Sequence, residues 1–463
     1  MSSSMRKLSL LAASLVLAGC SFMPRYERPA APVADVFPYP SAEEGTPPAQ
    51  LPWQSFFADA RLRSLIATAL ADNRDLRVAV LTIAQARALY DIRNADRLPT
   101  VGVGLSGSRA PNVAGEQVTI YQASFGFTSW EIDFFGRLAS LSESALAQYL
   151  ATEEGRKAAQ VTLVASVANQ WLNLAADEEL LKLTRDTLVT REETARLTRL
   201  RFEQGITSEI DFRLAQSLTE SSRAALAQLE RQRANDLNAL AVLVGQPVAP
   251  DFLVGVTTLD VSLPDVPAGL PSDVLVRRPD VRQAEQQLMA ASANIGAARA
   301  AFFPRITLTA GVGTASSELS GLFQGGSWGY TVAPTLLQPI FDAGRNRANL
   351  ASAEVSRDIA VAQYERAIQQ AFRDVADALA GRATYGEQLR ALTAVVEAES
   401  VRFRLARLRY ESGIASYLDL LDAQRALFTA QTTLVQSRLA RLQNQVQLYR
   451  ALGGGWTEAS ARP

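Results

Sequence analysis

Few residues in this sequence are suited to covalent or metal chemistry. Histidine is absent, Cys20 is the only cysteine, and the chain has four methionines, two of them in its first five residues. These counts remove the commonest general base, most zinc and copper sites and any disulfide within the chain. Carboxylates alone remain, and no nucleophile–base pair or metal cluster can be assembled from them. We therefore expect a protein that is not an enzyme and that holds no metal and no cofactor.

Cys20 is the one residue for which the sequence predicts a covalent modification. Arg6 and Lys7 precede the apolar stretch "LSLLAASLVLAG" (8–19), which has the length of a secretory signal peptide. It ends in "LAGC", which resembles the bacterial lipobox. That resemblance implies cleavage before Cys20, S-diacylglycerol on its thiol and N-palmitoyl on its amino group. An ordinary secretory signal with an unrelated cysteine is the alternative. Ser21 follows the cysteine. An Asp at this position would suggest retention in the inner membrane, so we expect the lipidated protein to be sorted to the outer membrane.

A second set of residues could act through charge. Leu418 and Asp422 are four positions apart, so they share one face of a helix, and Asp419 lies beside them. A carboxylate next to an apolar residue is unusual in a packed seam but suits a constriction. Repeated around a symmetry axis, these residues would form a Leu ring and an Asp ring, and such charge rings select cations. The alternative is a solvated Asp on a helix surface, which is the usual case.

Composition argues against a nucleic-acid partner and against a transmembrane helix. The formal net charge is -1, and Lys and Arg are spread along the chain, so we expect no nucleic-acid partner. No stretch of eighteen or more apolar residues occurs, so no transmembrane helix is predicted. A Pro-rich stretch at 23–48 predicts an extended surface segment.

The rest of the sequence consists of two copies of one unit. "RFEQGITSEIDFRLAQ" (201–216) and "RYESGIASYLDLLDAQ" (409–424) are identical at eight of sixteen positions, with an offset of 208. The same offset relates Gly136 to Gly344 and continues to Gly245 and Gly453, over more than a hundred residues. A register kept over that length indicates a duplicated fold.

Each unit is predicted to contain a helix, two strands, a long helix, a tight turn and a second helix. Pro99 and Pro304 end the first helices, expected at about 61–97 and 279–301. The long helices contain no proline and would be ~100 Å long at 1.5 Å per residue. They are expected at 137–204 and 345–412. Alternation of apolar with small or polar residues predicts strands at 101–107, 119–128, 306–312 and 328–336.

The strands have the composition of a barrel wall between lipid and water. One face is apolar or aromatic, and the other is Gly, Ser and Thr. Four strands cannot close such a barrel, and an open sheet edge in lipid leaves backbone groups unpaired. Two chains would supply eight strands and three would supply twelve; only the larger barrel leaves a usable bore, which favours three. The aromatic residues expected to form an interfacial belt are Tyr121, Phe125, Phe127, Trp130, Phe323, Trp328 and Tyr330.

These observations together divide the chain into segments. We expect a signal peptide at 1–19, a lipidated Pro-rich segment at 20–60, a first repeat at 61–245, a linker at 246–277, a second repeat at 278–453 and a tail at 454–463. The first repeat would hold strands at about 99–130 and a helical hairpin at 137–245. The second would hold strands at about 304–338 and a hairpin at 345–453.

Several motifs together resemble one family. They are the lipobox, the duplicated units, "SWEIDFFGRL" (129–138), the two Gly-Ile turns, "LDLLDAQRALFTAQ" (418–431) and "LYRALGGGW" (448–456). They are similar to the TolC-type outer-membrane factors, and most similar to the OprM-like, NodT-type lipoprotein branch. The resemblance implies a mainly α-helical homotrimer with a 12-stranded β-barrel in the outer-membrane lipid and a long α-helical barrel in the periplasm. It also implies a periplasmic adaptor and an inner-membrane RND-type transporter, with which the trimer would export drugs or other small molecules.

The resemblance also assigns roles to residues. The turns Gly205, Ile206, Thr207 and Gly413, Ile414, Ala415 would be hairpin tips that bind the adaptor, although any helix ending in a left-handed Gly has a similar pattern. Leu418, Asp419 and Asp422 would form the periplasmic gate. Other hypotheses stay open: the same duct for a secreted protein or a metal ion, or a lipid-anchored helical scaffold without a pore.

Overall fold

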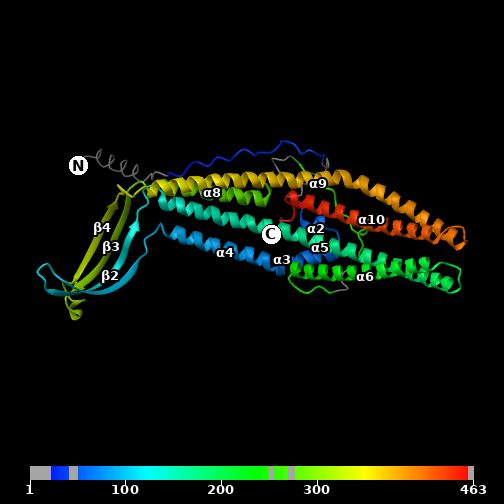
Figure 1. Ribbon diagram of the computed structural model, residues 1–463. Coiled ribbons are helices and arrows are strands. Elements are labelled where there is room, and N and C mark those ends of the chain that lie inside the picture. The colour runs from blue at the N-terminus through cyan, green and yellow to red at the C-terminus, as the bar shows by residue number, and fades with distance from the viewer. Residues whose placement is uncertain (1–21, 41–50, 250–254, 270–276, 457–463) are drawn as a thin grey trace. The chain divides into compact units, whose positions relative to one another are not determined.

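The computed structural model of the protein describes residues 22–40, 51–249, 255–269 and 277–456 (Figure 1). Long helices make up most of it, together with one four-stranded sheet. Cys20 and the signal-peptide stretch lie outside the described residues. Within those residues, none of the helices combines the length and apolar character that crossing a membrane requires.

The chain forms two compact units that do not follow the boundary between the sequence repeats. One unit contains Met1–Ala31, Leu81–Glu154 and Arg282–Arg366, and the other contains Pro32–Val80, Gly155–Val281 and Ala367–Pro463. Each unit therefore combines segments of both repeats, which means that the two copies fold together rather than as separate domains.

The first unit contains the sheet, whose strands pair in the order β1-β2-β3-β4, all antiparallel. Its register confirms the two faces that the sequence predicts. Val103, Phe125, Val312 and Tyr330 pair in one row across the sheet, and the next row is Gly104, Ser124, Gly313 and Gly329. In the described chain the outer edges of β1 and β4 have no strand partner, so the sheet is open. The strands are β1 (Gly102–Pro111), β2 (Gln117–Glu131), β3 (Arg305–Ser316) and β4 (Trp328–Leu337).

An ion cluster joins the end of the sheet to the first long helix. Glu131, the last residue of β2, is 9% exposed and accepts two hydrogen bonds from Arg137, at 2.8 and 2.7 Å. Its Oε2 also lies 2.6 Å from the Arg305 guanidinium at the start of β3. A buried carboxylate needs such paired cations, so Glu131 ties two strands to the helix that follows them.

The helix expected at 61–97 is wrong in one respect, because the chain breaks it at Asn73. The structure has α3 (Ala60–Asp72) and α4 (Arg74–Ala95), and Asn73 between them is extended, with ψ 131°. The Asn73 Oδ1 accepts the backbone N–H of Leu76 at 2.9 Å, as a cap does, and its Nδ2 donates to the carbonyl of Leu243 at 2.9 Å. The side chain thus replaces the helical hydrogen bonds that the break removes.

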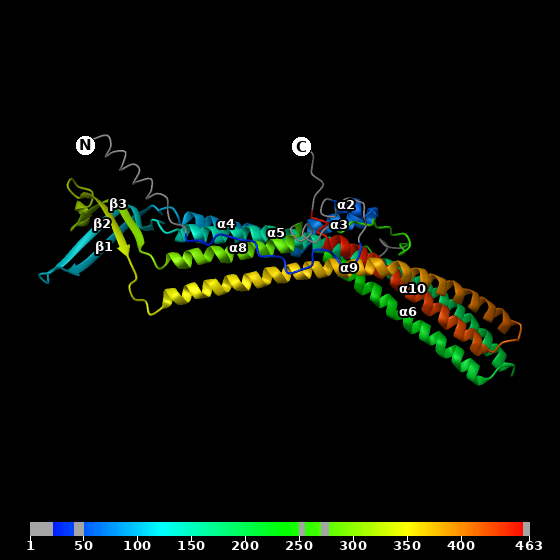
Figure 2. The same ribbon diagram turned by 90° about the horizontal axis from the view of Figure 1, so that it is seen from above.

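The remaining helices form two hairpins, both visible in Figures 1 and 2. We call α5 (Arg137–Glu203) and α6 (Glu209–Val244) the first hairpin, and α9 (Arg345–Glu411) and α10 (Tyr417–Ala451) the second hairpin. The helices α5 and α9 have 67 residues each, as the repeat requires. The shorter α8 (Pro279–Ala300) precedes β3, and a 3-10 turn, η2 (Leu319–Gly321), lies between β3 and β4.

The core of the second unit includes Trp53 and Phe56, which follow the Pro-rich stretch expected to be extended (23–48). Within 20–60, α2 (Trp53–Phe56) is helical, and Phe56 is fully buried, stacked on Tyr449 with ring centroids 4.0 Å apart. The Tyr449 hydroxyl donates to the carbonyl of Leu51 at 2.7 Å. These contacts attach the segment before the first repeat to α10, near the end of the second.

Residues 22–31 belong to the first unit and contact its helical part. Phe22 stacks on Phe303 with ring centroids 4.4 Å apart. The Arg28 guanidinium donates to both oxygens of Glu285 on α8, at 2.7 and 3.0 Å, and the Tyr26 hydroxyl donates to the same carboxylate at 2.9 Å. Stacking and charge together fix this segment on the helical surface.

Candidate functional site at the hairpin tips

The tip of the first hairpin is closed by hydrogen bonds that require a left-handed residue. The Gly205 N–H donates to the carbonyl of Phe202 at 2.9 Å, and the Ile206 N–H donates to that of Arg201 at 2.8 Å. This pair of bonds is a Schellman motif, and Gly205 has a φ of +70°. A Cβ at Gly205 would meet nothing within 4 Å, so the backbone conformation alone, rather than packing, requires glycine within the chain.

The tip of the second hairpin repeats this geometry. Gly413 has a φ of +75°, and the Ile414 N–H donates to the carbonyl of Arg409 at 2.8 Å. Ile206 is 72% exposed and Ile414 is 70% exposed. Two large apolar side chains thus lie exposed at equivalent places of the two hairpins.

The residues beside the two isoleucines start the returning helices. The Thr207 hydroxyl donates to Asp211 at 2.9 Å, while Ala415 has no side chain that could do so. In the second hairpin the Ser416 hydroxyl accepts the Asp419 N–H at 3.2 Å, and Asp419 accepts the Ser416 N–H at 3.1 Å. Asp419 therefore completes a capping box with Ser416, and this box fixes the start of α10.

Leu418 and Asp422 lie together on an exposed face of α10, as their spacing predicts. Leu418 is 64% exposed, and Asp422 is ion-paired with Arg402 on α9. Arg402 also contacts Glu399 at 3.1 Å. Arg402 was not among the residues singled out from the sequence, because it is twenty positions away on the other helix. The exposed carboxylate at this face is therefore part of a link between α9 and α10.

A groove of about 580 Å³ lies beside this ion pair in the second hairpin. It runs between α9 and α10, and both charged and apolar side chains line it. The lining residues are Ala398, Val401, Arg402, Leu405, Ala406, Arg409, Ala415, Asp419 and Asp422.

Two tyrosines of the second hairpin pack against the first. The Arg201 guanidinium lies 5.1 Å from the centre of the Tyr410 ring, and Tyr410 contacts Tyr417 with ring centroids 5.5 Å apart. Tyr417 is 5% exposed and packs in a cluster with Leu420 and Ala215. Burial raises the pKa of Tyr417 to about 12, although a hydrogen bond with Thr198 acts in the opposite direction. Thr198 is 1% exposed, so this contact is closed to water.

Sequence comparisons identify the family. The profile of the outer membrane efflux proteins matches residues 65–246 and 270–454. The chain belongs to this family. A probable efflux pump outer membrane protein of Pseudomonas putida, TtgC, is 44% identical over 467 residues, with 98% of this chain and 96% of the relative covered. Outer membrane protein OprJ of Pseudomonas aeruginosa is also 44% identical, over 97% of this chain and 96% of its own length.

Solved structures give the same result. The open state of the MtrE outer membrane channel of Neisseria gonorrhoeae superimposes with a TM-score of 0.87 at 40% identity, covering 94% of this chain and 99% of that one. A membrane protein from Pseudomonas aeruginosa gives 0.88 at 43% identity, covering 94% and 98%. These matches confirm the expected fold class and family. The protein is an outer-membrane channel component of an efflux pump.

Proposed function

We propose that three copies of this chain form a duct through the outer membrane. The observation that carries the proposal is the open four-stranded sheet, with one apolar face and one face of small and polar residues. Unpaired strand edges cost several kcal/mol per backbone group in lipid, so β1 and β4 require strands from neighbouring copies. Three copies supply twelve strands, enough for a bore.

The exposed apolar side chains of α4 support assembly. In α4 only Leu76 is buried, while Leu81, Leu89 and Ile92 are each more than half exposed. Apolar residues left open along one long helix gain free energy when a neighbouring copy covers them, at roughly 25 cal/mol per Å². The helices of the three copies then form a ring in the periplasm.

The proposed cargo is a small organic molecule. One relative is named for toluene efflux and another for antibiotic efflux, and both are 44% identical to this chain. The inner-membrane transporter would select the cargo, and the duct would conduct it without a catalytic step. A periplasmic adaptor would join the two at the tips, where Ile206 and Ile414 are exposed on Gly-based turns.

The proposed anchor and gate complete the duct. Cys20 would carry diacylglycerol and palmitate, and Phe22, two residues further on, packs on Phe303, which lies two residues before the first residue of β3. Leu418 and Asp422 of three copies would narrow the periplasmic entrance, where an Asp ring favours cations. Asp419 would support that entrance by capping α10.

A complementation experiment tests this function. A strain that lacks its own efflux channel but keeps a cognate adaptor and transporter is given this chain, and survival in toluene and in antibiotics is measured. Restored resistance is expected, and it should disappear when the transporter is deleted. Resistance that never returns, although the protein is present in the outer membrane, would contradict the proposal. Mass spectrometry of the mature N-terminus tests the lipid, and Cys20→Ser should remove it.

A further inference from the structure

Because the two hairpins are copies of one unit, a contact made by residues of one hairpin indicates an equivalent contact for the corresponding residues of the other. The offset of 208 maps the first hairpin onto the second, so Arg201 corresponds to Arg409 and Thr198 to Ala406. In the chain, Arg201 and Thr198 receive the two tyrosines of the second hairpin. We call the surface formed by Thr198 and Arg201 a seat, and two tyrosines occupy it. The corresponding residues of the second hairpin, Ala406 and Arg409, line the groove beside Asp422.

The groove is lined by side chains, but no side chain from the described part of the chain occupies it. Its residues Arg409 and Ala406 are the equivalents of the two that Tyr410 and Tyr417 cover in the first hairpin. Arg409 makes no side-chain hydrogen bond or ion pair among the described residues, and it is an exposed residue that lines the groove. Both hairpins thus carry an equivalent seat, and among the described residues only the seat on the first hairpin is filled by side chains.

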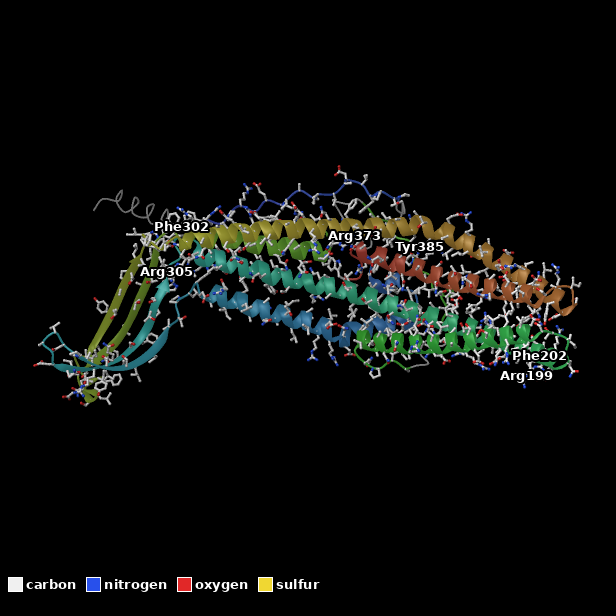
Figure 3. All side chains as sticks on the ribbon, in the orientation of Figure 1. Arg199, Phe202, Phe302, Arg305, Arg373 and Tyr385 are labelled. Atoms are coloured by element: carbon white, nitrogen blue, oxygen red, sulfur yellow. The ribbon has the colours of Figure 1, made fainter. Side chains whose placement is uncertain are left out.

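The side chains that correspond to the two tyrosines are Phe202 and Glu209. Phe202 lies in the last turn of α5 at the first tip, where Figure 3 labels it, and its ring stacks on Phe212 with centroids 5.6 Å apart. Glu209 begins α6, is 60% exposed at its side chain, and pairs only with Arg213 of its own helix within the described residues. Both lie on the first hairpin, and the described residues form no third hairpin for them to contact.

The chemistry of the groove matches these two side chains. An arginine receives a tyrosine ring in the filled seat, and Arg409 can receive the Phe202 ring in the same way. At the second position the hydroxyl of Thr198 is replaced by the methyl of Ala406, which cannot bind a polar group by a hydrogen bond. In this groove the carboxylate of Glu209 would instead lie near two guanidinium groups, those of the lining residues Arg402 and Arg409.

We propose that the groove of the second hairpin is the seat for the first tip of a neighbouring copy, with Phe202 against Arg409 and Glu209 against the two arginines. The proposal rests on the assembly of three copies proposed above, and it names the contact that closes the ring at its periplasmic end. The seat would place a second copy directly beside the Arg402–Asp422 ion pair. The neighbouring copy would then influence that pair through the charge of Glu209.

Cysteine crosslinking tests this contact in the full-length protein in the outer membrane. The double variant Phe202→Cys with Arg409→Cys is treated with a short bis-maleimide and separated on a denaturing gel. Dimers and trimers are expected. The matched control is Arg201→Cys with Tyr410→Cys, the contact observed inside one chain, which should link without any increase in the number of chains. Each single variant and the parent chain, which has Cys20 alone, should remain monomeric on the gel.

The outcomes separate this contact from the assembly itself. Native mass spectrometry of the same variants gives the number of chains per particle. If three-chain particles form but the Phe202–Arg409 pair yields no ladder, the contact is wrong and the assembly stands. If no three-chain particles form, both proposals fail. A ladder from the control pair would also overturn the contact, because it would show that the tyrosine seat is filled by a different copy.

A charge exchange gives a second test that does not need crosslinking. Arg409→Glu should reduce efflux several-fold because two carboxylates then meet, and Glu209→Arg should do the same because three cations meet. The double variant Glu209→Arg with Arg409→Glu should recover most of the activity. Failure of the double variant to exceed either single variant, at equal amounts of protein in the membrane, would contradict the contact.

Discussion

The carboxylate of Asp422 on α10 is ion-paired with the guanidinium of Arg402 on α9, and both side chains are exposed. This pair joins the two helices of the second hairpin a little more than two turns from its tip. In the first hairpin the equivalent residues are Leu214 and Thr194, which cannot form an ion pair. The two hairpins therefore differ in charge at the place where the gate is proposed.

Neutralising this carboxylate should open the entrance. Asp422→Asn leaves Arg402 without its partner on α10 and removes the negative ring, so we expect a several-fold increase in vancomycin sensitivity and a loss of cation selectivity in planar bilayers. The control is Asp358→Asn, because Asp358 is an exposed carboxylate of α9 that pairs with the adjacent Arg357. Permeability and reversal potential that match those of the parent would remove Asp422 from the gate.

Bulky residues at the tips should stop efflux without unfolding the hairpins. A Cβ at Gly205 or Gly413 would meet nothing within 4 Å in the chain, and the left-handed strain costs only about 1–2 kcal/mol. Gly205→Leu and Gly413→Leu should therefore leave the assembly intact and abolish resistance, because the surface offered to the adaptor changes.

The control for the tips is Gly115→Leu in the β1–β2 turn. Gly115 has a φ of +83° and equally open surroundings, so its strain is the same. Resistance should survive this change. Equal resistance in the tip variants and in the control would mean that the tips contact no partner.

The N-terminal segment should contribute to stability apart from any lipid. Arg28→Ala leaves Glu285, whose side chain is 10% exposed, with the Tyr26 hydroxyl as the remaining hydrogen bond described above. Because Arg28 itself is half exposed, we expect a loss of about 1 kcal/mol in the free energy of unfolding. The midpoint of thermal unfolding in detergent measures it. Glu27→Ala, at the neighbouring exposed position, should have no effect, and an equal shift in both variants would contradict the account.

Stability should fall as the pH rises towards 7, because of one buried carboxyl group. Asp177 on α5 is 2% exposed, and burial together with the nearby Asp236 of α6 raises its pKa to about 7. The neighbouring Glu178 acts in the same direction, Arg233 acts against it, and Gln232 donates to Asp177 at 3.1 Å.

The direction of this change in stability with pH follows from the number of protons that the folded and unfolded states bind. The folded state keeps the proton of Asp177 between about pH 4 and pH 7 while the unfolded state has lost it, so this favourable contribution declines across that window and is gone above it. Asp177→Asn should therefore be more stable than the parent at pH 8 and should flatten the dependence of the thermal midpoint on pH. Asp186→Asn, an exposed position on the same helix, should change neither. A parent protein whose midpoint is constant from pH 5 to 8 would contradict the assignment.

The sequence predicts the long helices and the strands well, because two independent copies carry the same pattern. The offset of 208 locates both tips, and the alternation in 101–107 and 119–128 predicts the rows that pair in the sheet. These features depend on local periodicity, which one chain displays along its length.

Other features depend on side chains that meet from distant parts of the chain. The break at Asn73 was missed because the apolar pattern continues through it, and the side chain that stabilises the break bonds to Leu243, 170 positions away. Arg402 was missed as the partner of Asp422 because the first repeat has Thr194 at that position. The contact of Arg28 with Glu285 spans 257 positions, and no periodic pattern marks it.

The central claim is that the sheet is completed by other copies of the chain. Native mass spectrometry of the protein extracted from outer membranes in mild detergent tests it most directly. The account predicts particles with three times the mass of one mature chain. Particles with the mass of a single chain, obtained without loss of the folded state, would contradict it, because four strands with two open edges would then be stable alone.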